Sequence, residues 1–243
     1  MRQTSPGRGF TLIELLVVVS IIALLIAILL PSLKSARDQA KRVACMSNQR
    51  QTYLTLQLYA LDNQGQVPLN HWGSTKQWNY LIRQGSSDYV QWGRLYVAKL
   101  LENPEIVYCP ACTYEPTMLN TSFNPWPPAA GQTTRIGWSA RPDITTNSNK
   151  FGAGGNLFPP NMLRLMDLSN KAIFADALSS FPFVDGVHEG EGINVTFGDG
   201  HTHWAYRTVI EQGPMDLDEI PLGFPASASL NIDNMWLQLD QTF

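Results

Sequence analysis

An uninterrupted apolar run near the N-terminus constrains this chain more than any other feature. From Phe10 to Leu30 the only clearly polar side chains are those of Thr11, Glu14 and Ser20. A helix needs about 20 predominantly apolar residues to cross the hydrocarbon core of a bilayer, so this run is long enough to span a membrane. Glu14 is the exception, because a carboxylate inside such a segment costs free energy unless it lies near the membrane surface or meets a cation.

Beyond Pro31 the pattern changes from wholly apolar to amphipathic. Small and apolar residues recur at steps of three and four, which is typical of a helix with one apolar face; they are Leu33, Ala36, Ala40, Val43, Ala44, Leu54, Leu58 and Leu61. Tyr53 and Leu56 flank this stripe. We expect a helical N-terminal segment over residues 10–65, kinked at Pro31 because proline lacks a backbone N–H. The helix itself should stop near Asp62, where Asp62-Asn63-Gln64-Gly65 is followed by Pro68. Its first part, to about residue 32, would span the membrane, and its stripe would pack on a globular head at residues 66–243.

The residues before the run, 1–9, form a short polar leader that contains Arg2 and Arg8. A secretory signal peptide has an apolar region of about 7–15 residues followed by a cleavage site, so we expect this longer run to remain in the mature chain. Basic residues favour the cytoplasmic side of a membrane. Four more basic residues lie just beyond the other end of the run, so charge alone does not fix the orientation; they are Lys34, Arg37, Lys41 and Arg42.

The start of the run matches a known signature. Residues Gly9, Phe10, Thr11, Leu12, Ile13 and Glu14, followed by the apolar run and Pro31, resemble the signature of type IV prepilins and type II secretion pseudopilins. The resemblance implies that a prepilin peptidase cuts between Gly9 and Phe10 on the cytoplasmic side and methylates the new N-terminal residue. The alternative is an ordinary signal anchor in which Gly9 and Glu14 occur by chance.

The same resemblance implies an α+β fold shaped like a lollipop, with a long N-terminal helix packed on an antiparallel β-sheet head. The subunit would wait in the cytoplasmic membrane, with a single span and an extracytoplasmic head, and then join a filament in the periplasm or on the cell surface. Its partners would be the prepilin peptidase, an assembly platform protein and sister subunits. Glu14 of one subunit would meet the amine of Phe10 of a neighbour; alternatively it serves only its own N-terminus or the peptidase.

Three further stretches resemble a large group of pilin-like proteins with an "H-X9-DG" C-terminal motif. They are Cys45-Met46-Ser47-Asn48, Tyr59 to Pro68, and the pair Cys109-Pro110. The motif itself matches at His188, Asn194, Asp199 and Gly200, followed by His201, although ten residues rather than nine separate His188 from Asp199. Asp-Gly between two alternating runs predicts a hairpin of Ile193–Phe197 with His201–Tyr206. We expect His188 to hydrogen-bond the turn and pin its loop to the hairpin.

The three cysteines, Cys45, Cys109 and Cys112, make an odd count. In an oxidising compartment one disulfide is expected, either Cys109–Cys112 or one of these two with Cys45. The Cys-x-x-Cys spacing also occurs in redox sites and zinc ribbons. A ribbon needs a second pair and a redox site needs a βαβ unit, and the sequence offers neither.

Two metal sites are conceivable from spacing alone. His201 and His203 alternate to one face of a strand and, with His188, would make three zinc ligands. Asp185, Glu189 and Glu191 would offer oxygens to calcium, although solvated acidic residues explain them more simply. No general base of the His-Glu-x-x-His kind, serine–histidine pair or carboxylate pair stands out. We therefore predict no cofactor, no metal and no catalytic residue.

The composition narrows the partners. The formal charge is −3, and removal of residues 1–9 takes away two arginines and moves it to −5, so nucleic-acid binding is not expected. The head carries many aromatic residues, namely Trp72, Trp78, Tyr80, Tyr89, Trp92, Tyr96 and Tyr108. We expect a structural pilin or pseudopilin subunit. The alternatives are a minor tip subunit that binds a substrate or carbohydrate through these aromatics, and a membrane-tethered metal-dependent enzyme.

Overall fold

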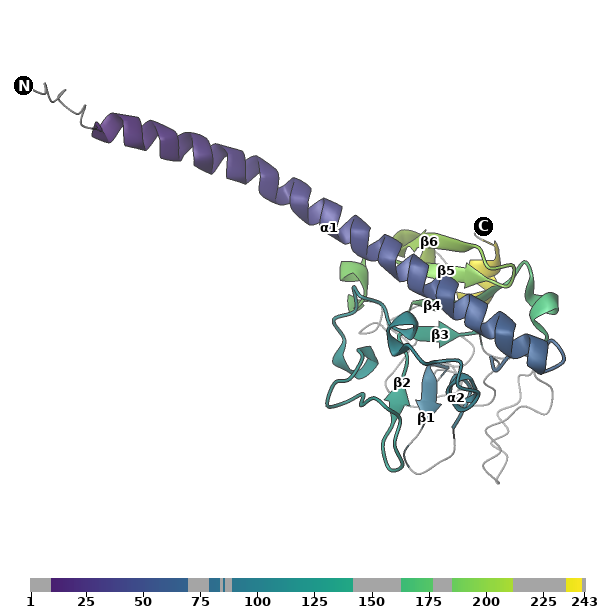
Figure 1. The fold of residues 1–243 in the computed structure, drawn as a ribbon. Helices are drawn as coiled ribbons and strands as arrows, with labels where there is room; N and C mark the ends of the chain where they lie inside the picture. The colour runs from purple at the N-terminus through teal and green to yellow at the C-terminus, as the bar shows by residue number, and fades with distance from the viewer. Residues whose placement is uncertain are drawn as a thin grey trace, which may run out of the picture. The chain divides into compact units, whose positions relative to one another are not determined.

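A computed structural model describes residues 10–69, 79–83, 85, 89–141, 163–176, 185–211 and 235–241. The chain divides into two compact units, Met1–Ala40 and Lys41–Phe243. The architecture is α+β, as predicted: a long helix, α1 (Leu12–Asp62), precedes a set of short helices and antiparallel strands (Figure 1).

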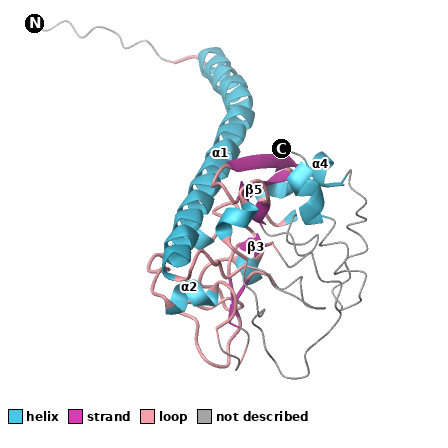
Figure 2. Cartoon of the chain, turned by 90° about the vertical axis from the view of Figure 1, so that its right-hand side faces the viewer, coloured by secondary structure: helices cyan, strands magenta, loops and turns pink. Residues whose placement is uncertain are grey.

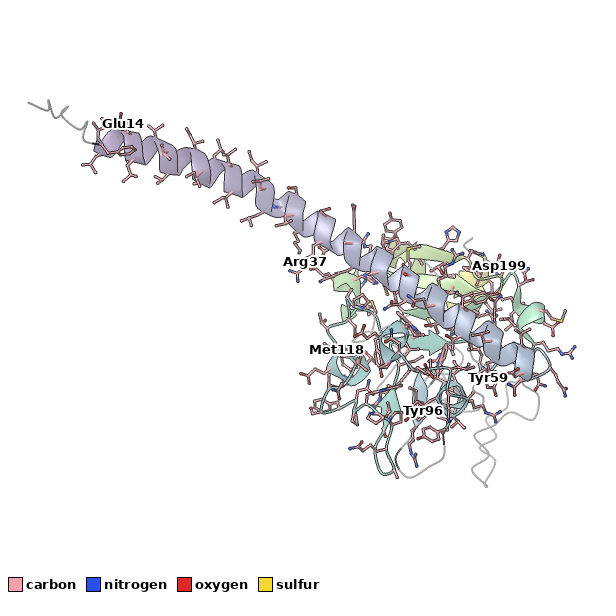
Figure 3. All side chains as sticks on the ribbon, viewed as in Figure 1. Glu14, Arg37, Tyr59, Tyr96, Met118 and Asp199 are labelled. Atoms are coloured by element: carbon pink, nitrogen blue, oxygen red, sulfur yellow. The ribbon has the colours of Figure 1, made fainter. Side chains whose placement is uncertain are left out.

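In the first unit the described residues belong to α1 and the two residues before it. Large apolar side chains from Phe10 to Leu30 are exposed, and Figure 3 shows them projecting on all sides of the helix. In the described part of the chain, α1 is the helix that is long and apolar enough to cross a membrane, by length and composition only. Its helical assignment continues through Pro31, and the kink expected there stays a prediction.

The C-terminal end of α1 agrees with the helix stop that the sequence predicts near Asp62. The helix ends at Asp62, where Gln64 and Gly65 take left-handed φ angles of 58° and 81°. The amide of Gly65 then donates to the carbonyl of Ala60 at 2.8 Å. Such a left-handed closure satisfies the last carbonyls of a helix and stops it.

The second half of α1 packs on the head through a face that the sequence did not predict. Its buried residues are Cys45, Gln49, Thr52, Tyr53, Thr55, Leu56, Tyr59 and Ala60. The predicted stripe faces solvent instead, with Val43, Leu54, Leu58 and Leu61 between 50% and 80% exposed. The two flanking residues, Tyr53 and Leu56, are therefore the ones that contribute to the core.

Polar side chains on the buried face explain this difference. Asn48 donates to the carbonyl of Tyr108 at 3.0 Å. The hydroxyl of Thr52 donates to the carbonyl of Ile106 at 2.8 Å. These carbonyls belong to the end of a short 3-10 helix, η2 (Pro104–Val107), and to the residue after it. Buried carbonyls need donors, so the helix presents amides and hydroxyls to this irregular segment rather than leucines.

The sheet has four antiparallel strands in the order β3 (Trp138–Ala140), β4 (Ala172–Asp176), β5 (Gly192–Phe197) and β6 (Thr202–Tyr206). Strands β5 and β6 form the predicted hairpin, with Ile193 opposite Ala205 and Val195 opposite His203. A second, two-stranded sheet joins β1 (Leu81–Arg83) to β2 (Thr134–Arg135). Figures 1 and 2 show the second half of α1 alongside the larger sheet.

Short helices complete the described part of the head. They are α2 (Gly93–Val97), η2 (Pro104–Val107), η3 (Glu115–Thr117), η4 (Leu165–Leu168), η5 (His188–Gly190) and α4 (Arg207–Glu211), and residues 235–241 are also helical. Trp92, Trp138 and Trp236 lie fully buried in one core with Leu56 of α1. Asp240 anchors the last helix by accepting from both terminal guanidinium nitrogens of Arg141, at 2.7 and 2.8 Å. A paired arrangement of this kind fixes the geometry as well as the charge.

Candidate functional site

The N-terminal segment has a defined local structure at Glu14. Its carboxylate accepts from the amide of Thr11 at 2.9 Å and from the Thr11 hydroxyl at 2.8 Å. The Glu14 amide donates back to the Thr11 hydroxyl at 3.2 Å. This reciprocal pair is a capping box, which satisfies otherwise unpaired donors at the start of a helix. Phe10 is 72% exposed beside it, and Gly9 lies outside the described residues.

The Asp199-Gly200 turn joins β5 to β6 as predicted. The amide of Gly200 donates to the carbonyl of Phe197, and the amide of Phe197 donates to the carbonyl of His201, both at 2.9 Å. The Asp199 carboxylate accepts from the His201 amide at 3.0 Å and from its ring nitrogen. Asp199 thus stabilises the turn. Partial burial by itself would raise the pKa of Asp199, but the hydrogen bonds from the backbone and ring of His201 together outweigh burial and lower that pKa.

Gly200 also brings the turn against α1. Its φ of +90° is a conformation that suits glycine. A Cβ atom added there would lie 2.4 Å from Cε1 of Tyr53, so the ring of Tyr53 occupies the space that any side chain would need. The Tyr53 hydroxyl donates to the carbonyl of Gly198 at 2.8 Å. The glycine of the motif therefore lets the hairpin turn dock on the helix.

His188 contacts the hairpin at Asn194 of β5, and not at the backbone of the Asp199-Gly200 turn as the prediction had it. It begins η5, and its described side-chain contacts run to a buried polar cluster instead. Its Nε2 atom lies 3.2 Å from Oδ2 of Asp176, 3.4 Å from Sγ of Cys109 and 3.2 Å from Nδ2 of Asn194. The motif residues thus separate into two places: Asp199 and Gly200 at the turn, and His188 and Asn194 in the cluster.

The cluster also contains a cysteine pair that spans α1 and the head. Sγ of Cys45 lies 2.8 Å from Sγ of Cys109 and 3.0 Å from Oδ1 of Asp176. Both cysteines are free thiols here. One potential ligand atom from each of Cys45, Cys109, Asp176 and His188 lies within 4.8 Å of the other three, and all four residues are buried.

Neighbouring amides hold the carboxylate of Asp176 in position. Oδ1 accepts from Nε2 of Gln49 at 3.1 Å, and Oδ2 accepts from the amide and side-chain nitrogens of Asn194 at 2.6 and 3.1 Å. Sequence analysis missed Asp176 and Gln49. Asp176 is the polar end of an otherwise apolar strand, β4, where it is fully buried, and that placement is the signal that would have found it.

Burial and neighbouring charges shift the pKa values of the cluster. Burial raises the pKa of Cys45 well above its usual range, and the hydrogen bond to Cys109 and the charge of Asp176 act in the same direction. Burial by itself would also raise the pKa of Cys109. The hydrogen bonds with Cys45 and His188 outweigh the effect of burial, so the pKa of Cys109 is lowered. Burial by itself would lower the pKa of His188, but Asp176 and Cys109 raise it to about 9. Of the two thiols, Cys109 loses its proton more readily.

The structure distinguishes among the cysteine pairings that the sequence left open. Cys112 stands outside the cluster, with its Sγ 3.3 Å from the hydroxyl of Thr117 and 3.7 Å from the carbonyl of Tyr114. The short sulfur–sulfur distance joins Cys45 to Cys109. A disulfide therefore remains a prediction, and the pair that the geometry favours for it is Cys45–Cys109.

The two metal sites conceived from spacing do not assemble among the described residues. His201 pairs with Asp199, and its ring stacks on Phe197, while His188 faces the buried cluster. In the proposed calcium loop, Asp185 pairs with Arg207, and Glu191 pairs with Arg42. The group of Cys45, Cys109, Asp176 and His188 is the one set of three or more such ligands that converges in the described part of the chain.

The aromatic residues of the head act mainly as core. Tyr80, Trp92 and Tyr108 are buried, and Tyr89 and Tyr96 pack against the same core with partial exposure. Trp72 and Trp78 lie outside the described residues. The five described aromatics therefore do not form the exposed platform that carbohydrate stacking requires.

Comparison with known proteins bears on the N-terminal end of the chain. Residues 6–30 match the family model described as the prokaryotic N-terminal methylation motif. This match covers the glycine, phenylalanine and glutamate of the signature and most of the apolar run. The N-terminus of this chain is a prepilin-type segment. Sequence analysis predicted this assignment, and the family match confirms it.

The chain is also similar to curated proteins over part of its length. The chain is 41% identical over 57 residues to the type IV wide pilus major component PilA4 of Thermus thermophilus, covering 24% of this chain and 44% of that protein. It is 34% identical over 77 residues to the type II secretion system core protein G of Escherichia coli, covering 32% and 49%. The protein of that name from Pseudomonas aeruginosa is 42% identical over 61 residues, covering 25% and 43%.

The chain thus spans less than half the length of the curated relatives it matches. No solved structure matches the chain.

Proposed function

We propose that this chain is a structural subunit, a pilin or pseudopilin, that polymerises into a type IV pilus-like or type II secretion filament. The observation that carries the proposal is the match of residues 6–30 to the prokaryotic N-terminal methylation motif, at the N-terminal end of a 51-residue helix. Relatives named as a pilus major component and as a secretion core protein support it.

Processing is the first step of the proposed function. A prepilin peptidase cuts between Gly9 and Phe10 and methylates the new amino group. The released subunit keeps the first part of α1, to about residue 32, as its membrane span, with the head on the extracytoplasmic side. The apolar side chains of residues 10–30 are exposed in the isolated chain, and in water such a surface is unfavourable, so lipid covers it before assembly and other subunits cover it afterwards.

The exposed stripe on the second half of α1 supports contacts between sister subunits. Leu54, Leu58 and Leu61 are 50%, 54% and 80% exposed on a helix whose other face is already buried in the head. Their spacing of four and three residues forms one continuous ridge. A neighbouring α1 that packs on this ridge would bury it, as expected for helices gathered in a filament.

The proposed role is structural and not enzymatic. The relatives are named as a pilus component and as secretion core proteins. Of the histidines predicted as an alternative metal centre, His201 and His203 lie with ring centroids 5.1 Å apart, but His188 faces the buried cluster with Asp176. The assembly platform, the peptidase and sister subunits are the proposed partners.

The test is to follow the full chain in its native cell. An epitope placed after the last described residue, 241, is detected by electron microscopy and in sheared filament fractions. We expect labelled filaments along which the epitope repeats. Label confined to filament ends supports the tip-subunit alternative, and label confined to the membrane in cells that do form filaments would contradict the proposal.

A further inference from the structure

Four side chains with metal-binding atoms converge in the head from four separate segments of the chain. Cys45 comes from the second half of α1 and Cys109 follows η2, while Asp176 ends β4 and His188 begins η5. All four are buried, and one ligand atom of each lies within 4.8 Å of the others. Two thiols, an imidazole and a carboxylate form a donor set that zinc accepts in proteins.

The separations approach those around a tetrahedral ion. With zinc–sulfur bonds of about 2.3 Å and zinc–nitrogen bonds of about 2.0 Å, neighbouring ligand atoms lie about 3.3–3.8 Å apart. The sulfur of Cys109 is 3.4 Å from Nε2 of His188, and that nitrogen is 3.2 Å from Oδ2 of Asp176. Cys45 is closer to its neighbours, at 3.0 Å from Asp176 and 2.8 Å from Cys109, so its sulfur must move outward by about 1 Å to reach this range.

The surroundings of the carboxylate resemble those of a metal ligand. Asp176 is fully buried, and the ion pair that the described residues give it is with His188. Gln49 and Asn194 donate to its two oxygens and so fix its orientation. Hydrogen bonds of this kind commonly hold the ligands of a metal site in place, and a buried negative charge is more stable beside a cation.

The backbone at His188 is held in an unusual conformation. His188 and Glu189 take left-handed φ angles of 48° and 56°, in a region where residues other than glycine are uncommon. This conformation directs the imidazole inward, edge-on to the ring of Trp204 at 5.1 Å between ring centroids. A ligand role for the imidazole accounts for keeping two strained residues in succession.

We propose that Cys45, Cys109, Asp176 and His188 bind one zinc ion that joins the second half of α1 to the sheet and to the segment after η2. All four positions are supplied by the protein, so the site is structural. Binding releases the protons of the two thiols and of the imidazole, and the ion then bonds to two thiolates, a carboxylate and a neutral imidazole.

A Cys45–Cys109 disulfide is the competing state of the same two sulfurs. It requires an oxidant that takes up the two thiol hydrogens, forms one bond between the sulfurs and leaves Asp176 and His188 paired with each other. In that state Cys45 has no proton to donate, so its sulfur would lie 3.0 Å from a carboxylate oxygen without a hydrogen bond. A metal ion instead uses all four groups, and this favours the zinc site.

The test measures metal and disulfide content in the same sample. The full chain is extracted in detergent from the membrane of its native cell, without added metal or reductant, and free thiols are blocked at once. We expect about one zinc per chain by elemental analysis and no Cys45–Cys109 linkage by peptide mapping. Protein that is folded, contains the linkage and lacks metal would overturn the proposal, as would protein with neither.

Variants locate the metal on the proposed ligands. Asp176→Asn keeps the shape of the carboxylate, and His188→Gln removes the imidazole; each should lower zinc content at least about tenfold. Cys112→Ser is the matched control, a buried cysteine outside the cluster, and should keep the full content. Retention of zinc in the Asp176 and His188 variants, or its loss in Cys112→Ser alone, would show that the ion binds elsewhere.

Measurements on the wild-type chain test the site even if the variants do not fold. In the full chain a strong chelator should lower the unfolding temperature of the head, and added zinc should restore it, because the ion binds the folded state. Cobalt(II) that replaces zinc should give the absorption of thiolate-to-metal charge transfer. An unfolding temperature that a chelator does not change, together with no cobalt–thiolate absorption, would reject the site without any mutation.

Discussion

The carboxylate of Glu14 accepts hydrogen bonds from both the backbone amide and the hydroxyl of Thr11, three positions before it. In the single chain, Glu14 therefore has a complete local role as part of a capping box. The proposed contact with the Phe10 amine of a neighbouring subunit is a second role. The two roles can be separated because Thr11 takes part in only one of them.

We predict that Glu14→Ala is cleaved and stays in the membrane but enters filaments at least about tenfold less than wild type. The reason is that the variant leaves the Phe10 amine of the neighbouring subunit without its carboxylate partner. An unpaired charge in an apolar environment costs about 2.5 kcal/mol or more. Thr11→Ala is the control, since it removes the two hydrogen bonds of the Thr11 hydroxyl, worth about 1 kcal/mol, and keeps the carboxylate. Immunoblots of sheared filament and membrane fractions give the ratio. Equal incorporation of Glu14→Ala and wild type would eliminate the docking role, and equal defects in both variants would assign Glu14 to capping.

We predict that the mature chain begins at N-methyl-Phe10. Intact-mass analysis of protein from its native membrane should show the loss of residues 1–9 and the addition of one methyl group. Gly9→Val should remain uncut, because it places a branched side chain at the bond that is cleaved. Gly7→Val should be processed normally, since it lies two residues farther from that bond. An uncut wild-type chain in filaments would contradict this prediction.

We predict that substitution of Leu56 in α1 lowers the stability of the head, whereas substitution of Leu58 lowers assembly into filaments. Leu56 is fully buried, so Leu56→Ala should lower the free energy of unfolding by about 2–5 kcal/mol. Leu58 is 54% exposed, so Leu58→Gln should change it by less than about 0.5 kcal/mol. If a neighbour buries Leu58, the same change should reduce filament incorporation about tenfold, because burial of a leucine contributes about 1.5–3 kcal/mol. Thermal unfolding in detergent and filament fractionation measure the two effects, and normal assembly of Leu58→Gln would exclude this ridge from the interface.

We predict that Gly200→Ala destabilises the head more than Gly131→Ala does. Both glycines have left-handed φ angles, +90° and +82°, so both variants carry a backbone penalty of about 1–2 kcal/mol. A Cβ at Gly131 meets nothing within 4 Å, whereas one at Gly200 overlaps the Tyr53 ring. The overlap adds about 1–3 kcal/mol, which should appear as a further drop in unfolding temperature. Equal effects of the two variants would show that the turn does not dock tightly on α1.

Some parts of the fold could be predicted from local pattern. The Asp-Gly turn between two alternating runs correctly indicated the β5–β6 hairpin, since turn type and strand period are properties of neighbouring residues. The same kind of pattern placed the wrong face of α1 on the head. Leu54, Leu58 and Leu61 are spaced as a core stripe is, but burial of a helix face depends on its partner, and here the partner offers carbonyls to Asn48 and Thr52.

The sequence by itself determined the apolar N-terminal helix and the prepilin-type signature, because each depends on residues within a few positions of one another. Only the tertiary structure decided what His188 does. Its partners Asp176 and Cys109 lie on other segments, and Cys45 is 131 residues from Asp176 along the chain. Spacing in sequence carries no information about such a meeting, since it depends on how the helix, the sheet and the loops pack together.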